Sequence, residues 1–372
     1  MAGGDRRIAI LISYSGDGGV ERMMNNLIAG LLGAGHGVDV LVLRGEGQHF
    51  AALPAGARVV RFGTAHAALV VPALARYLRR QRPAALLAAK DRAGRAAIKA
   101  RRLARVPTRI VVRIGNTLSQ SLAGRSRLRR TLRYRPIRRL YPLADAIVAV
   151  SRGVAEDVVA TSGVDPARVS VIENPVITED LERRAREPVD HPWFAQRTAP
   201  VILGVGRLTR QKDFPTLLAA FARVREQREA RLLILGEGED RRALECRAGT
   251  LGIADSFDLV GFADNPYAYM ARTDLFVLSS AWEGSPNALT EAMHLGVPVV
   301  STDCRSGPRE VLDGGRIAPL VPVGDSEALA RAIVATLDAP PNGAALRAAV
   351  AAYTRERSTA RYLEILGMEP TC

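Results

Sequence analysis

The chain has 372 residues, of which 48% are hydrophobic and 24% are charged, and its formal net charge is +14. This composition is typical of a globular protein and excludes a disordered or low-complexity chain, while the length predicts two domains. Three scattered cysteines exclude a disulfide framework and lack zinc-site spacing, which indicates a reducing compartment. No stretch approaches the roughly 18 apolar residues of a membrane span. We therefore expect a cytoplasmic protein whose membrane contact is peripheral.

The positive charge is concentrated in the first half of the chain. Residues 1–190 contain 32 Lys and Arg against 16 Asp and Glu, whereas residues 191–372 contain 20 against 22. The segment 76–139 alone contains 21 basic residues and a single acid, Asp91. This asymmetry predicts an anionic partner for the first half: a membrane surface, a phosphorylated acceptor or nucleic acid.

Short apolar runs alternate along the chain with longer segments rich in Ala, Leu, Arg and Glu, which favour helix. Fully apolar strands that alternate with helices are typical of parallel sheets covered on both faces. The runs lie at 8–13, 38–43, 84–89, 109–114, 146–150, 200–206, 231–236, 257–262, 274–280 and 297–302. This is too many strands for one compact sheet, so we predict two Rossmann-like α/β domains with the ligand site between their strand ends. The predicted division is 1–185 for the first domain, 186–199 for a linker, 200–350 for the second domain and 351–372 for a C-terminal helix that closes the second domain or crosses back to the first.

Loops at three predicted strand ends carry candidate ligand-binding residues. Gly18 and Gly19 precede a helix, so the backbone can approach a ligand and the helix end can offer N–H groups to an anion. Arg207 and Lys212 follow the first strand of the second domain and can face one diphosphate. Gly236 repeats the strand–glycine–helix pattern one unit later. Taken alone, a plain turn or a solvated surface charge explains each of these features as well.

The segment EGSPNALTEAMHLG predicts a helix that is capped by Ser285 and has Pro286 in its first position. The backbone N–H groups of Asn287, Ala288 and Leu289 then lack an intrahelical acceptor. The capping-box position is alanine rather than Glu or Gln, so an anionic ligand could satisfy these donors.

Two carboxylates, Glu283 and Glu291, flank this predicted helix start. Carboxylates are bidentate acceptors for vicinal hydroxyls, so both residues can bind a sugar or a ribose. The alternative is a capped, charge-decorated helix with no ligand. The combination of E-x7-E after an apolar strand with G-R-L-x3-K about seventy residues earlier resembles the GT-B retaining glycosyltransferases of family GT4. The ending TDCRSGPREVL is similar to a subgroup that builds surface polysaccharides and lipid-linked oligosaccharides.

The resemblance implies a GT-B fold, with two Rossmann-like domains that face each other across a cleft, and a role for each matching residue. Arg207 and Lys212 would neutralise the donor diphosphate, Glu283 would face the donor sugar, Glu291 would bind the ribose and Phe262 would lie beside the nucleobase. Arg207, Lys212 and Glu283 are the predicted catalytic residues. The rest of the predicted donor site consists of Gly18, Gly19, Gly236, Ser285, Asn287, Ala288 and Leu289.

Two features bear on the chemistry that the resemblance implies. The sequence has no D-x-D motif, so we expect no metal and no other cofactor, with the two cations in place of a divalent ion. Many family members carry a histidine near the sugar in the first domain, but here that region contains Lys90 and Asp91. Asp91 and Asn116 are therefore the candidates for acceptor contact.

The basic segment 125–150 has Leu128 and Leu132 at helical spacing among arginines, which fits a basic amphipathic helix on an anionic membrane. A solvated arginine-rich face is the alternative. The function predicted is transfer of a hexose or N-acetylhexosamine from a nucleotide sugar, preferably UDP-linked, to a lipid-linked or surface-polysaccharide acceptor at the cytoplasmic face of the inner membrane. The rivals are a sugar-nucleotide epimerase or phosphorylase on the same fold, and a nucleic-acid-binding protein, which the pI of 10.5 invites. No nucleic-acid motif or interleaved aromatics support the last, so no nucleic-acid partner is expected.

Overall fold

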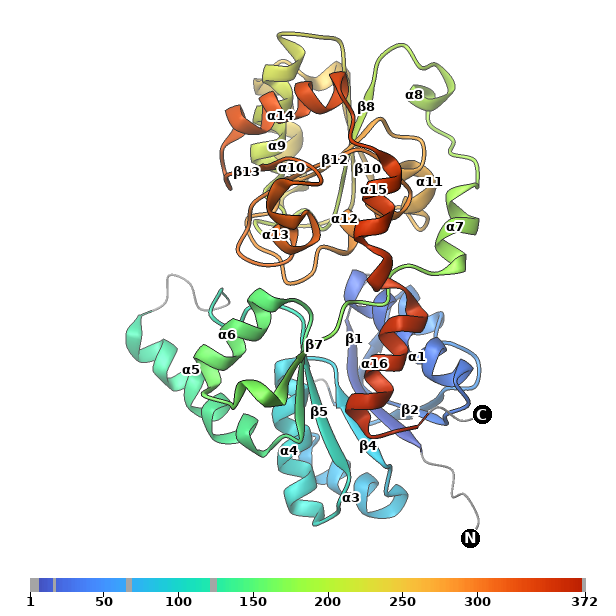
Figure 1. Ribbon diagram of the computed structural model, residues 1–372, viewed down its shortest axis with the longest axis vertical. Helices are drawn as coiled ribbons and strands as arrows, with labels where there is room; N and C mark the ends of the chain where they lie inside the picture. The colour runs from blue at the N-terminus through green and yellow to red at the C-terminus, as the bar shows by residue number, and fades with distance from the viewer. Residues whose placement is uncertain (1–6, 16–17, 65–68, 121–125, 370–372) are drawn as a thin grey trace. The chain divides into compact units, whose positions relative to one another are not determined.

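The computed structural model describes residues 7–15, 18–64, 69–120 and 126–369 (Figure 1). The chain divides into two compact units, one formed by Met1–Pro175 together with Thr354–Cys372 and the other by Val176–Tyr353. None of the helices in the described part of the chain is long and apolar enough to cross a membrane.

The first unit is built on a seven-stranded sheet in the order β3-β2-β1-β4-β5-β6-β7, in which every pair is parallel. Its strands are β1 (Ile8–Ser15), β2 (Val38–Glu46), β3 (Arg58–Arg61), β4 (Ala85–Ala88), β5 (Arg109–Ile114), β6 (Ala146–Ala149) and β7 (Val169–Val171). Its α-helices are α1 (Gly19–Gly33), α2 (Gln48–Ala51), α3 (Val71–Gln81), α4 (Asp91–Ala104), α5 (Arg127–Leu140), α6 (Arg152–Ser162) and α16 (Arg355–Leu366). Because consecutive parallel strands need crossover connections, helices cover the faces of the sheet.

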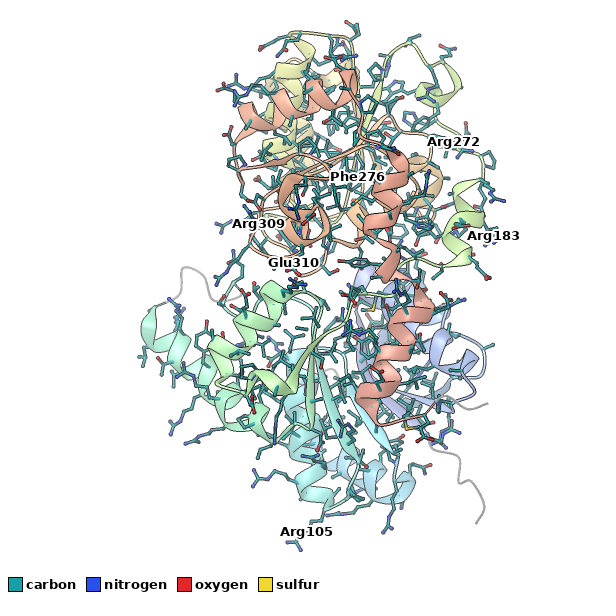
Figure 2. The ribbon with its side chains drawn as sticks, viewed as in Figure 1. Arg105, Arg183, Arg272, Phe276, Arg309 and Glu310 are labelled. Atoms are coloured by element: carbon teal, nitrogen blue, oxygen red, sulfur yellow. The ribbon has the colours of Figure 1, made fainter. Side chains whose placement is uncertain are left out.

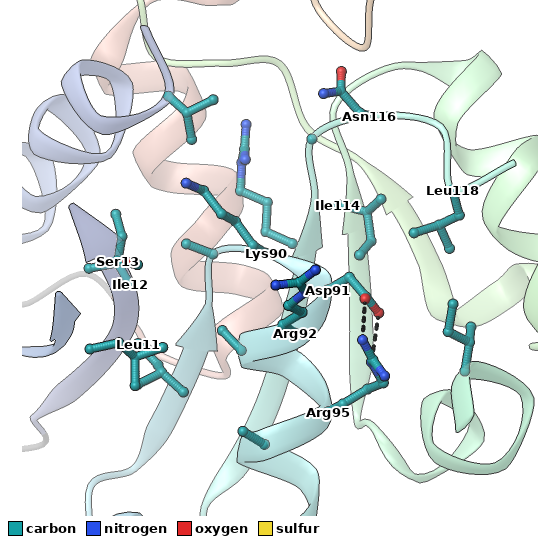
Figure 3. Close-up of a pocket in the computed structure, with 18 of the residues that line it drawn as sticks. Leu11, Ile12, Ser13, Lys90, Asp91, Arg92, Arg95, Ile114, Asn116 and Leu118 are labelled. Atoms are coloured by element: carbon teal, nitrogen blue, oxygen red, sulfur yellow. Dashed lines mark hydrogen bonds and ion pairs between the residues drawn. The ribbon is translucent and has the colours of Figure 1, made fainter. Parts of the chain in front are cut away.

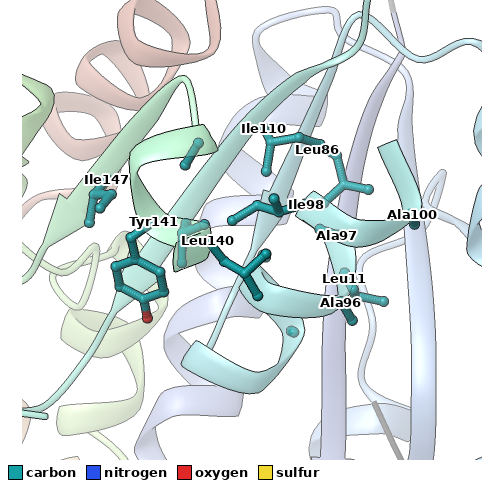
Figure 4. Packing of buried hydrophobic residues seen from close by; sticks show 14 of the residues in the cluster. Leu11, Leu86, Ala96, Ala97, Ile98, Ala100, Ile110, Leu140, Tyr141 and Ile147 are labelled. Carbon is teal, nitrogen blue, oxygen red and sulfur yellow. The ribbon is translucent and has the colours of Figure 1, made fainter. Parts of the chain in front are cut away.

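One core of this unit lies between the sheet and the helices α3 and α4 (Figure 4). Leu86 and Ile110 of the sheet are fully buried there beside Ala97 and Ala100 of α4. Small residues on α4 allow a close approach, since a Cβ built on Gly94 would lie 2.4 Å from Cγ1 of Val112. Helix α4 is therefore held firmly against β5, and its first turn stands at the ends of the strands.

The C-terminal helix α16 packs on the first unit, where it contacts α1, β4 and β5. Ser358 Oγ donates to the backbone oxygen of Glu173, and Arg109 Nε donates to the backbone oxygen of Ile365. A Cβ on Gly30 of α1 would lie 2.1 Å from Oγ1 of Thr359, which shows how closely the two helices approach. The last helix thus belongs to the same unit as the first strand.

The second unit is built on a six-stranded parallel sheet in the order β10-β9-β8-β11-β12-β13. Its strands are β8 (Val201–Val205), β9 (Arg231–Leu235), β10 (Phe257–Gly261), β11 (Leu275–Leu278), β12 (Val299–Thr302) and β13 (Leu320–Val321). Its α-helices are α7 (Glu179–Ala185), α8 (Pro192–Ala195), α9 (Phe214–Arg225), α10 (Arg241–Thr250), α11 (Pro266–Met270), α12 (Asn287–His294), α13 (Pro308–Val311), α14 (Ser326–Asp338) and α15 (Gly343–Ala349). Figure 2 shows Phe276 of β11 inside this unit and Arg183 of α7 projecting from it.

The unit boundary lies between Pro175 and Val176, earlier in the chain than the sequence predicts. The predicted linker is packed into the second unit instead. Asn265 Nδ2 donates to the backbone oxygen of Arg184 and to Glu187 Oε2, and the ring of Phe194 lies edge-on to Tyr269. Prolines and the lack of a clear period indicated a linker, but short helices and side-chain contacts order the segment.

A buried carboxylate, Asp39 on β2, ties three segments of the first unit together. Arg7 Nε and Arg58 Nε donate to its Oδ1 at 2.8 and 2.9 Å, and Tyr77 Oη donates to its Oδ2 at 2.6 Å. Burial opposes ionisation, but these hydrogen bonds outweigh it and hold the pKa of Asp39 below its ordinary value. The ionised form therefore stabilises the fold above the ordinary pKa, and this contribution is lost as the pH falls through the lowered value.

We expect Asp39→Asn to lower the free energy of unfolding at pH 7 by about 3 kcal/mol, because two arginines lose their buried partner. The difference from the wild type should begin to shrink below the ordinary carboxyl pKa of about 4 and should vanish only below the lowered pKa of Asp39, where the folded wild type is also neutral. Thermal unfolding at pH 7 and through a series from about pH 4 to pH 2 measures both effects. Glu156→Gln, at an exposed position on α6, is the control and should change neither. An Asp39→Asn deficit that persists in full at low pH would contradict this account.

Candidate active site

The strand order reverses direction at one place in each sheet, and both predicted sites lie there. In the second unit the reversal falls between β8 and β11, and in the first it falls between β1 and β4. Ligands of open parallel sheets bind at such switch points, beyond the carboxyl ends of the strands. The loop after β8 carries Arg207 and Lys212, and the loop after β11 carries Glu283.

The structure brings Lys212 and Glu283 into direct contact. Lys212 Nζ lies 2.6 Å from Glu283 Oε1, although 71 positions separate the two residues. Ser280 Oγ donates to the same oxygen at 2.7 Å. The side chains of Lys212 and Glu283 are 18% and 7% exposed. Because the pair is largely shielded from water, its charges interact more strongly than a surface ion pair would.

Side-chain hydrogen bonds to backbone oxygens hold the loops after β8 and β11 together. Ser279 Oγ donates to the backbone oxygen of Lys212 at 2.7 Å, and Gln211 Nε2 donates to the backbone oxygen of Trp282 at 3.0 Å. Ser306 Oγ, from the loop after β12, donates to the backbone oxygen of Glu283 at 2.6 Å. Gln211, Ser280 and Ser306 were not among the residues predicted from the sequence. A small polar residue close behind a buried strand was the available signal for Ser280.

Arg207 contrasts with Lys212, because its side chain is exposed and forms no ion pair with any residue that the structure describes. The turn that carries it is packed against the loop after β9. A Cβ built on Gly236 would lie 1.9 Å from the backbone oxygen of Gly206, and Gly236 has a φ of +149°. Glycine is therefore required there for the two loops to meet, which gives Gly236 a packing role.

The start of helix α12 differs from the prediction. The helix begins at Asn287 with Pro286 as its N-cap residue, so Pro286 does not occupy the first helical position. Ser285 makes no capping hydrogen bond; instead its backbone oxygen accepts from the N–H of Asn287 at 3.1 Å. The prediction of a Ser285 side-chain cap is wrong, because Pro286 has a ψ of 78°, outside the helical region, and the helix begins one residue later.

This helix start leaves polar atoms available to a ligand. Ser285 Oγ is buried and has no hydrogen-bond partner among the described residues. No hydrogen bond from the backbone N–H of Ala288 or Leu289 to another residue is found in the described part of the chain. These groups follow Glu283 by a few residues, so a ligand at Glu283 is close to donors that the helix itself does not use.

The remaining donor-side predictions lie at two places in the second unit. Glu291 is in α12 and is 1% exposed, so its carboxylate faces the interior rather than the solvent. Phe262 directly follows β10, two strands from β8 in the sheet, and its side chain is 43% exposed. An exposed aromatic ring at the carboxyl end of a strand is unusual for a core residue, and it is available for contact with a planar ligand.

Cys304 lies in the loop after β12, close to these charges. Burial first, and then the charge of Glu283, raise the pKa of the Cys304 thiol to about 12. The thiol is therefore neutral near pH 7 and is not a nucleophile. No cluster of three or more His, Cys, Asp or Glu side chains that could hold a metal ion is found among the described residues.

In the first unit, Gly18, Gly19 and Asp91 lie at the β1–β4 switch point, and Asn116 follows the neighbouring strand β5. Gly18 is the N-cap residue of α1 and Gly19 begins the helix. Lys90, which precedes α4, donates from Nζ to Glu21 Oε1 of α1 at 3.0 Å. Asp91 and Asn116 both line one pocket of about 710 Å³ (Figure 3).

Asp91 is not a free carboxylate. Arg95, one turn further along α4, donates to both of its oxygens, at 3.1 and 2.7 Å, and Tyr141 Oη donates to Oδ1 at 2.9 Å. A carboxylate with three donors is held in a fixed orientation. Asp91 thus lines the pocket with partners that the sequence did not reveal.

Comparison with known families divides the chain in the same two parts. Residues 17–180 match the family model described as Glycosyltransferase Family 4, and residues 199–339 match that described as Glycosyl transferases group 1. The chain belongs to the GT-B glycosyltransferases. The prediction of a GT-B glycosyltransferase with two α/β units, each built on a parallel sheet, is thus confirmed.

Several relatives of this glycosyltransferase are known. It is 32% identical over 199 residues to the N-acetylgalactosamine-N,N'-diacetylbacillosaminyl-diphospho-undecaprenol 4-alpha-N-acetylgalactosaminyltransferase of Campylobacter jejuni, covering 54% of this chain and 52% of that protein. It is 32% identical over 233 residues to the lipopolysaccharide core biosynthesis glycosyltransferase LpsE of Rhizobium meliloti, covering 61% of this chain and 65% of LpsE. The chain thus spans between a third and two thirds of the length of the first relatives that it matches.

Solved structures share the fold of this glycosyltransferase over nearly its whole length. The crystal structure of Anabaena HepE in complex with UDP and glucose aligns with a TM-score of 0.78 at 18% identity, covering 97% of this chain and 99% of HepE. The apo form of the lipopolysaccharide outer core galactosyltransferase WaaB aligns with a TM-score of 0.73 at 21% identity, covering 97% of this chain and 99% of WaaB. At these identities the likeness establishes the fold alone.

Proposed function

We propose that the protein transfers a hexose or N-acetylhexosamine from a nucleotide sugar, preferably a UDP-sugar, to a lipid-linked or surface-polysaccharide acceptor. The observation that carries the proposal is the Lys212–Glu283 contact at the switch point of the second unit, with Arg207 exposed nearby. Cations that face a carboxylate suit a ligand with two chemically different ends. The diphosphate would bind Arg207 and Lys212, and the sugar hydroxyls would bind Glu283.

The proposed chemistry follows from these charges. The bond between the sugar C1 and the diphosphate oxygen breaks, a bond between C1 and an acceptor hydroxyl oxygen forms, and the hydroxyl proton passes to the departing phosphate. Negative charge grows on the leaving diphosphate while the sugar becomes cationic. Arg207, Lys212 and the N–H groups at the start of α12 would stabilise the negative charge on the diphosphate. The Glu283 carboxylate would stabilise the positive charge on the sugar. We propose that no metal ion is required, with the two cations in that role.

Retention of configuration belongs to the same proposal. If the acceptor hydroxyl attacks from the face that the diphosphate leaves, the configuration at C1 is kept. Departing phosphate oxygens on that face can accept the hydroxyl proton, so no separate base is needed. In the first unit of this chain, Lys90 and Asp91 lie in the region where many family members carry a histidine. A route that needs no separate base suits this difference.

The names of relatives support the donor and acceptor classes proposed here. HepE was solved with UDP and glucose, and the name of the Campylobacter relative specifies an undecaprenol diphosphate carrier. Two other relatives are lipopolysaccharide core glycosyltransferases of Rhizobium meliloti. These names point to nucleotide-sugar donors and to acceptors of the cell envelope, which is also where the excess of basic residues in the first half would be useful.

The proposal is tested with a panel of UDP-, GDP-, ADP- and CMP-sugars. We expect one nucleotide class to raise the Tm, because a ligand at about 100 times its Kd adds about 2.7 kcal/mol to the free energy of unfolding. The same compound should be slowly hydrolysed to nucleoside diphosphate and free sugar with no acceptor present. Conversion of the donor to an epimer, or cleavage that depends on inorganic phosphate, would contradict transfer. So would the absence of any response across the panel.

Helix α5 is the proposed membrane contact of the first unit. Leu128 and Leu132 are 70% and 58% exposed, and Arg129, Arg130 and Arg133 surround them. Each arginine near an anionic leaflet contributes about 1 kcal/mol, so several arginines would give a difference of about two orders of magnitude between anionic and neutral vesicles. We propose peripheral binding at the cytoplasmic face of the inner membrane on this basis.

We expect the protein to sediment with phosphatidylglycerol vesicles at low salt and not with phosphatidylcholine vesicles. Adding 0.5 M salt should release the protein, because counterions then screen the attraction between the arginines and the anionic headgroups beyond a few ångströms. Leu128→Asp combined with Leu132→Asp should abolish the binding. Leu103→Asp, at an exposed leucine of α4 in the same unit, is the matched control and should not. Equal binding to both kinds of vesicle would argue against a membrane role for α5.

A further inference from the structure

The loop between β11 and α12, which carries Glu283, is held by hydrogen bonds at four consecutive residues. Thr302 Oγ1 donates to the backbone oxygen of Ser280 at 2.6 Å. The N–H of Ala281 donates to the backbone oxygen of Gln211 at 2.8 Å. The two contacts described above hold the backbone oxygens of the next two residues. Because the backbone of this loop is bonded at each of these residues, the main freedom left to Glu283 is the orientation of its side chain.

Ser280 and Lys212 both bind the same oxygen of the Glu283 carboxylate. The Ser280 side chain is fully buried, so its hydroxyl group cannot donate to water, and Oγ donates to Glu283 Oε1 at 2.7 Å. Lys212 Nζ lies 2.6 Å from that oxygen. A carboxylate oxygen has about two acceptor positions. The two donors therefore occupy the hydrogen-bonding capacity of Oε1.

The other oxygen of Glu283, Oε2, is in a different situation. It accepts no hydrogen bond from any residue that the structure describes, and it is not one of the fully buried polar atoms without a partner. The Glu283 side chain is 7% exposed. Oε2 is therefore the carboxylate atom that remains available to a ligand.

The Ser280 hydroxyl, rather than the lysine, decides which oxygen is left available. An ammonium group is a compact point charge on a flexible stem, so Lys212 attracts either oxygen of a carboxylate equally well. The Ser280 hydroxyl group is short, buried and attached to a backbone that Thr302 holds in place. Its hydrogen bond to Oε1 is thus the contact that fixes the orientation of the carboxylate.

We propose that Ser280 is a positioning residue, which holds Oε1 of Glu283 so that Oε2 alone accepts a hydrogen bond from one hydroxyl of the donor sugar. This inference rests on the proposed function and deepens it. Two vicinal hydroxyls would need both oxygens of the carboxylate for a bidentate contact, and Oε1 is already occupied. Glu283 contacts the sugar, and Ser280 acts only through Glu283.

A series of donor analogues, each lacking one sugar hydroxyl, measures this contact. The parent compound is the nucleotide sugar that the panel identifies, and the readout is kcat/KM for transfer or donor hydrolysis. We expect the wild type to lose about tenfold or more in kcat/KM for the analogue that lacks the bound hydroxyl, because a carboxylate oxygen is then left without its partner.

The Ser280→Ala variant shows which of these losses depends on the positioned carboxylate. It should lower kcat for the intact donor about tenfold, and the loss for one analogue should shrink to about threefold or less. The Kd of UDP, which lacks the transferred sugar, should stay close to the wild-type value. Losses that are the same in both proteins for every analogue would overturn the positioning role. A smaller loss for two analogues would overturn the contact with a single hydroxyl.

The UDP measurement also separates a positioning role from a structural one. A loss of UDP affinity in Ser280→Ala as large as the loss in kcat would show that Ser280 supports the whole site, and would overturn the inference. Ser256→Ala is the matched control, because Ser256 is a buried serine before β10 in the same unit, with Oγ 3.1 Å from the backbone oxygen of Ile253. This control should keep the wild-type kcat and the wild-type losses, and the inference falls if it reproduces the changes of Ser280→Ala.

The same measurements distinguish failure of this inference from failure of the proposed function. If the wild type uses the intact donor and Ser280→Ala keeps every wild-type loss, this inference is refuted and the transferase proposal stands. If no nucleotide sugar is bound or turned over by the wild type, the proposed function is refuted, and this inference is refuted with it.

Discussion

Replacing Lys212 with methionine should lower kcat for sugar transfer or donor hydrolysis by about 10²–10³-fold, the usual cost of losing one positioned group that stabilises transition-state charge. Methionine keeps the unbranched shape of lysine and removes only the charge. Glu283 would keep the hydrogen bond from Ser280 Oγ, so its loop has a reason to stay in place. Steady-state kinetics with the nucleotide sugar identified in the panel measures the effect.

Two companion variants show whether the loss is specific. Glu283→Gln keeps the size and the Ser280 contact but removes the carboxylate that would oppose the developing positive charge, so a similar loss is expected. Arg223→Gln, at an exposed position on α9 of the same unit, is the matched control and should retain wild-type kcat. Full activity in both Lys212→Met and Glu283→Gln would show that the pair is structural and that the site lies elsewhere.

Gly236→Ala should destabilise the second unit by about 2 kcal/mol or more and displace the turn that carries Arg207. The new Cβ would lie 1.9 Å from the backbone oxygen of Gly206, a distance that cannot be tolerated without movement of one loop. The φ of +149° at this position adds backbone strain for any residue with a side chain. Urea unfolding followed by tryptophan fluorescence reports on this unit, because both tryptophans of the chain, Trp193 and Trp282, belong to it.

Gly249→Ala is the matched control for this prediction. Gly249 lies in helix α10 of the same unit, and a Cβ built on it meets nothing within 4 Å. Alanine at an open helical position should stabilise by about 0.4–1 kcal/mol, because it reduces the conformational freedom of the unfolded chain. If Gly236→Ala and Gly249→Ala shifted the unfolding midpoint alike, the close approach of the two loops would not exist in solution.

The sheets were predictable because their central strands are apolar along their whole length. All ten apolar runs correspond to strands, and nine of them lie inside a sheet, whereas the tenth, β10, is an edge strand. The three missed strands, β3, β7 and β13, are each at an edge. These three strands are short and partly exposed, as in β3, where two arginines flank two valines, so they lack the continuous apolar pattern.

The candidate site was predictable as a set of residue types at strand ends, but not as a set of contacts. Strand ends of a parallel sheet meet at one edge, which explains why Arg207, Lys212 and Glu283 could be named together. The Lys212–Glu283 contact and the clamp from Ser306 connect loops that are distant in sequence, so only the folded chain reveals them. The start of α12 was misplaced because Ser285 and Pro286 both favour a helix that begins at Pro286, whereas the folded chain gives Pro286 a non-helical ψ of 78°.

The pocket of the first unit was beyond sequence reasoning for a similar reason. In the sequence Arg113 is one charged residue within an apolar strand, and only the structure shows that its side chain is 1% exposed. The surplus of basic residues between 76 and 139 was evident, and it predicted an anionic partner. Which of those residues point into a pocket and which face the solvent depends on how α4 and α5 pack.

The central claim, that Arg207 and Lys212 bind the donor diphosphate, is tested most directly by comparing UDP with UMP. Calorimetry gives the Kd of each nucleotide for the wild type and for Lys212→Met. The wild type should prefer UDP, because a charge-assisted contact to the second phosphate contributes about 1.5–3 kcal/mol, or about 10–150-fold in Kd. This preference should shrink by at least tenfold in Lys212→Met while the Kd of UMP changes little. An unchanged preference for UDP would contradict the account.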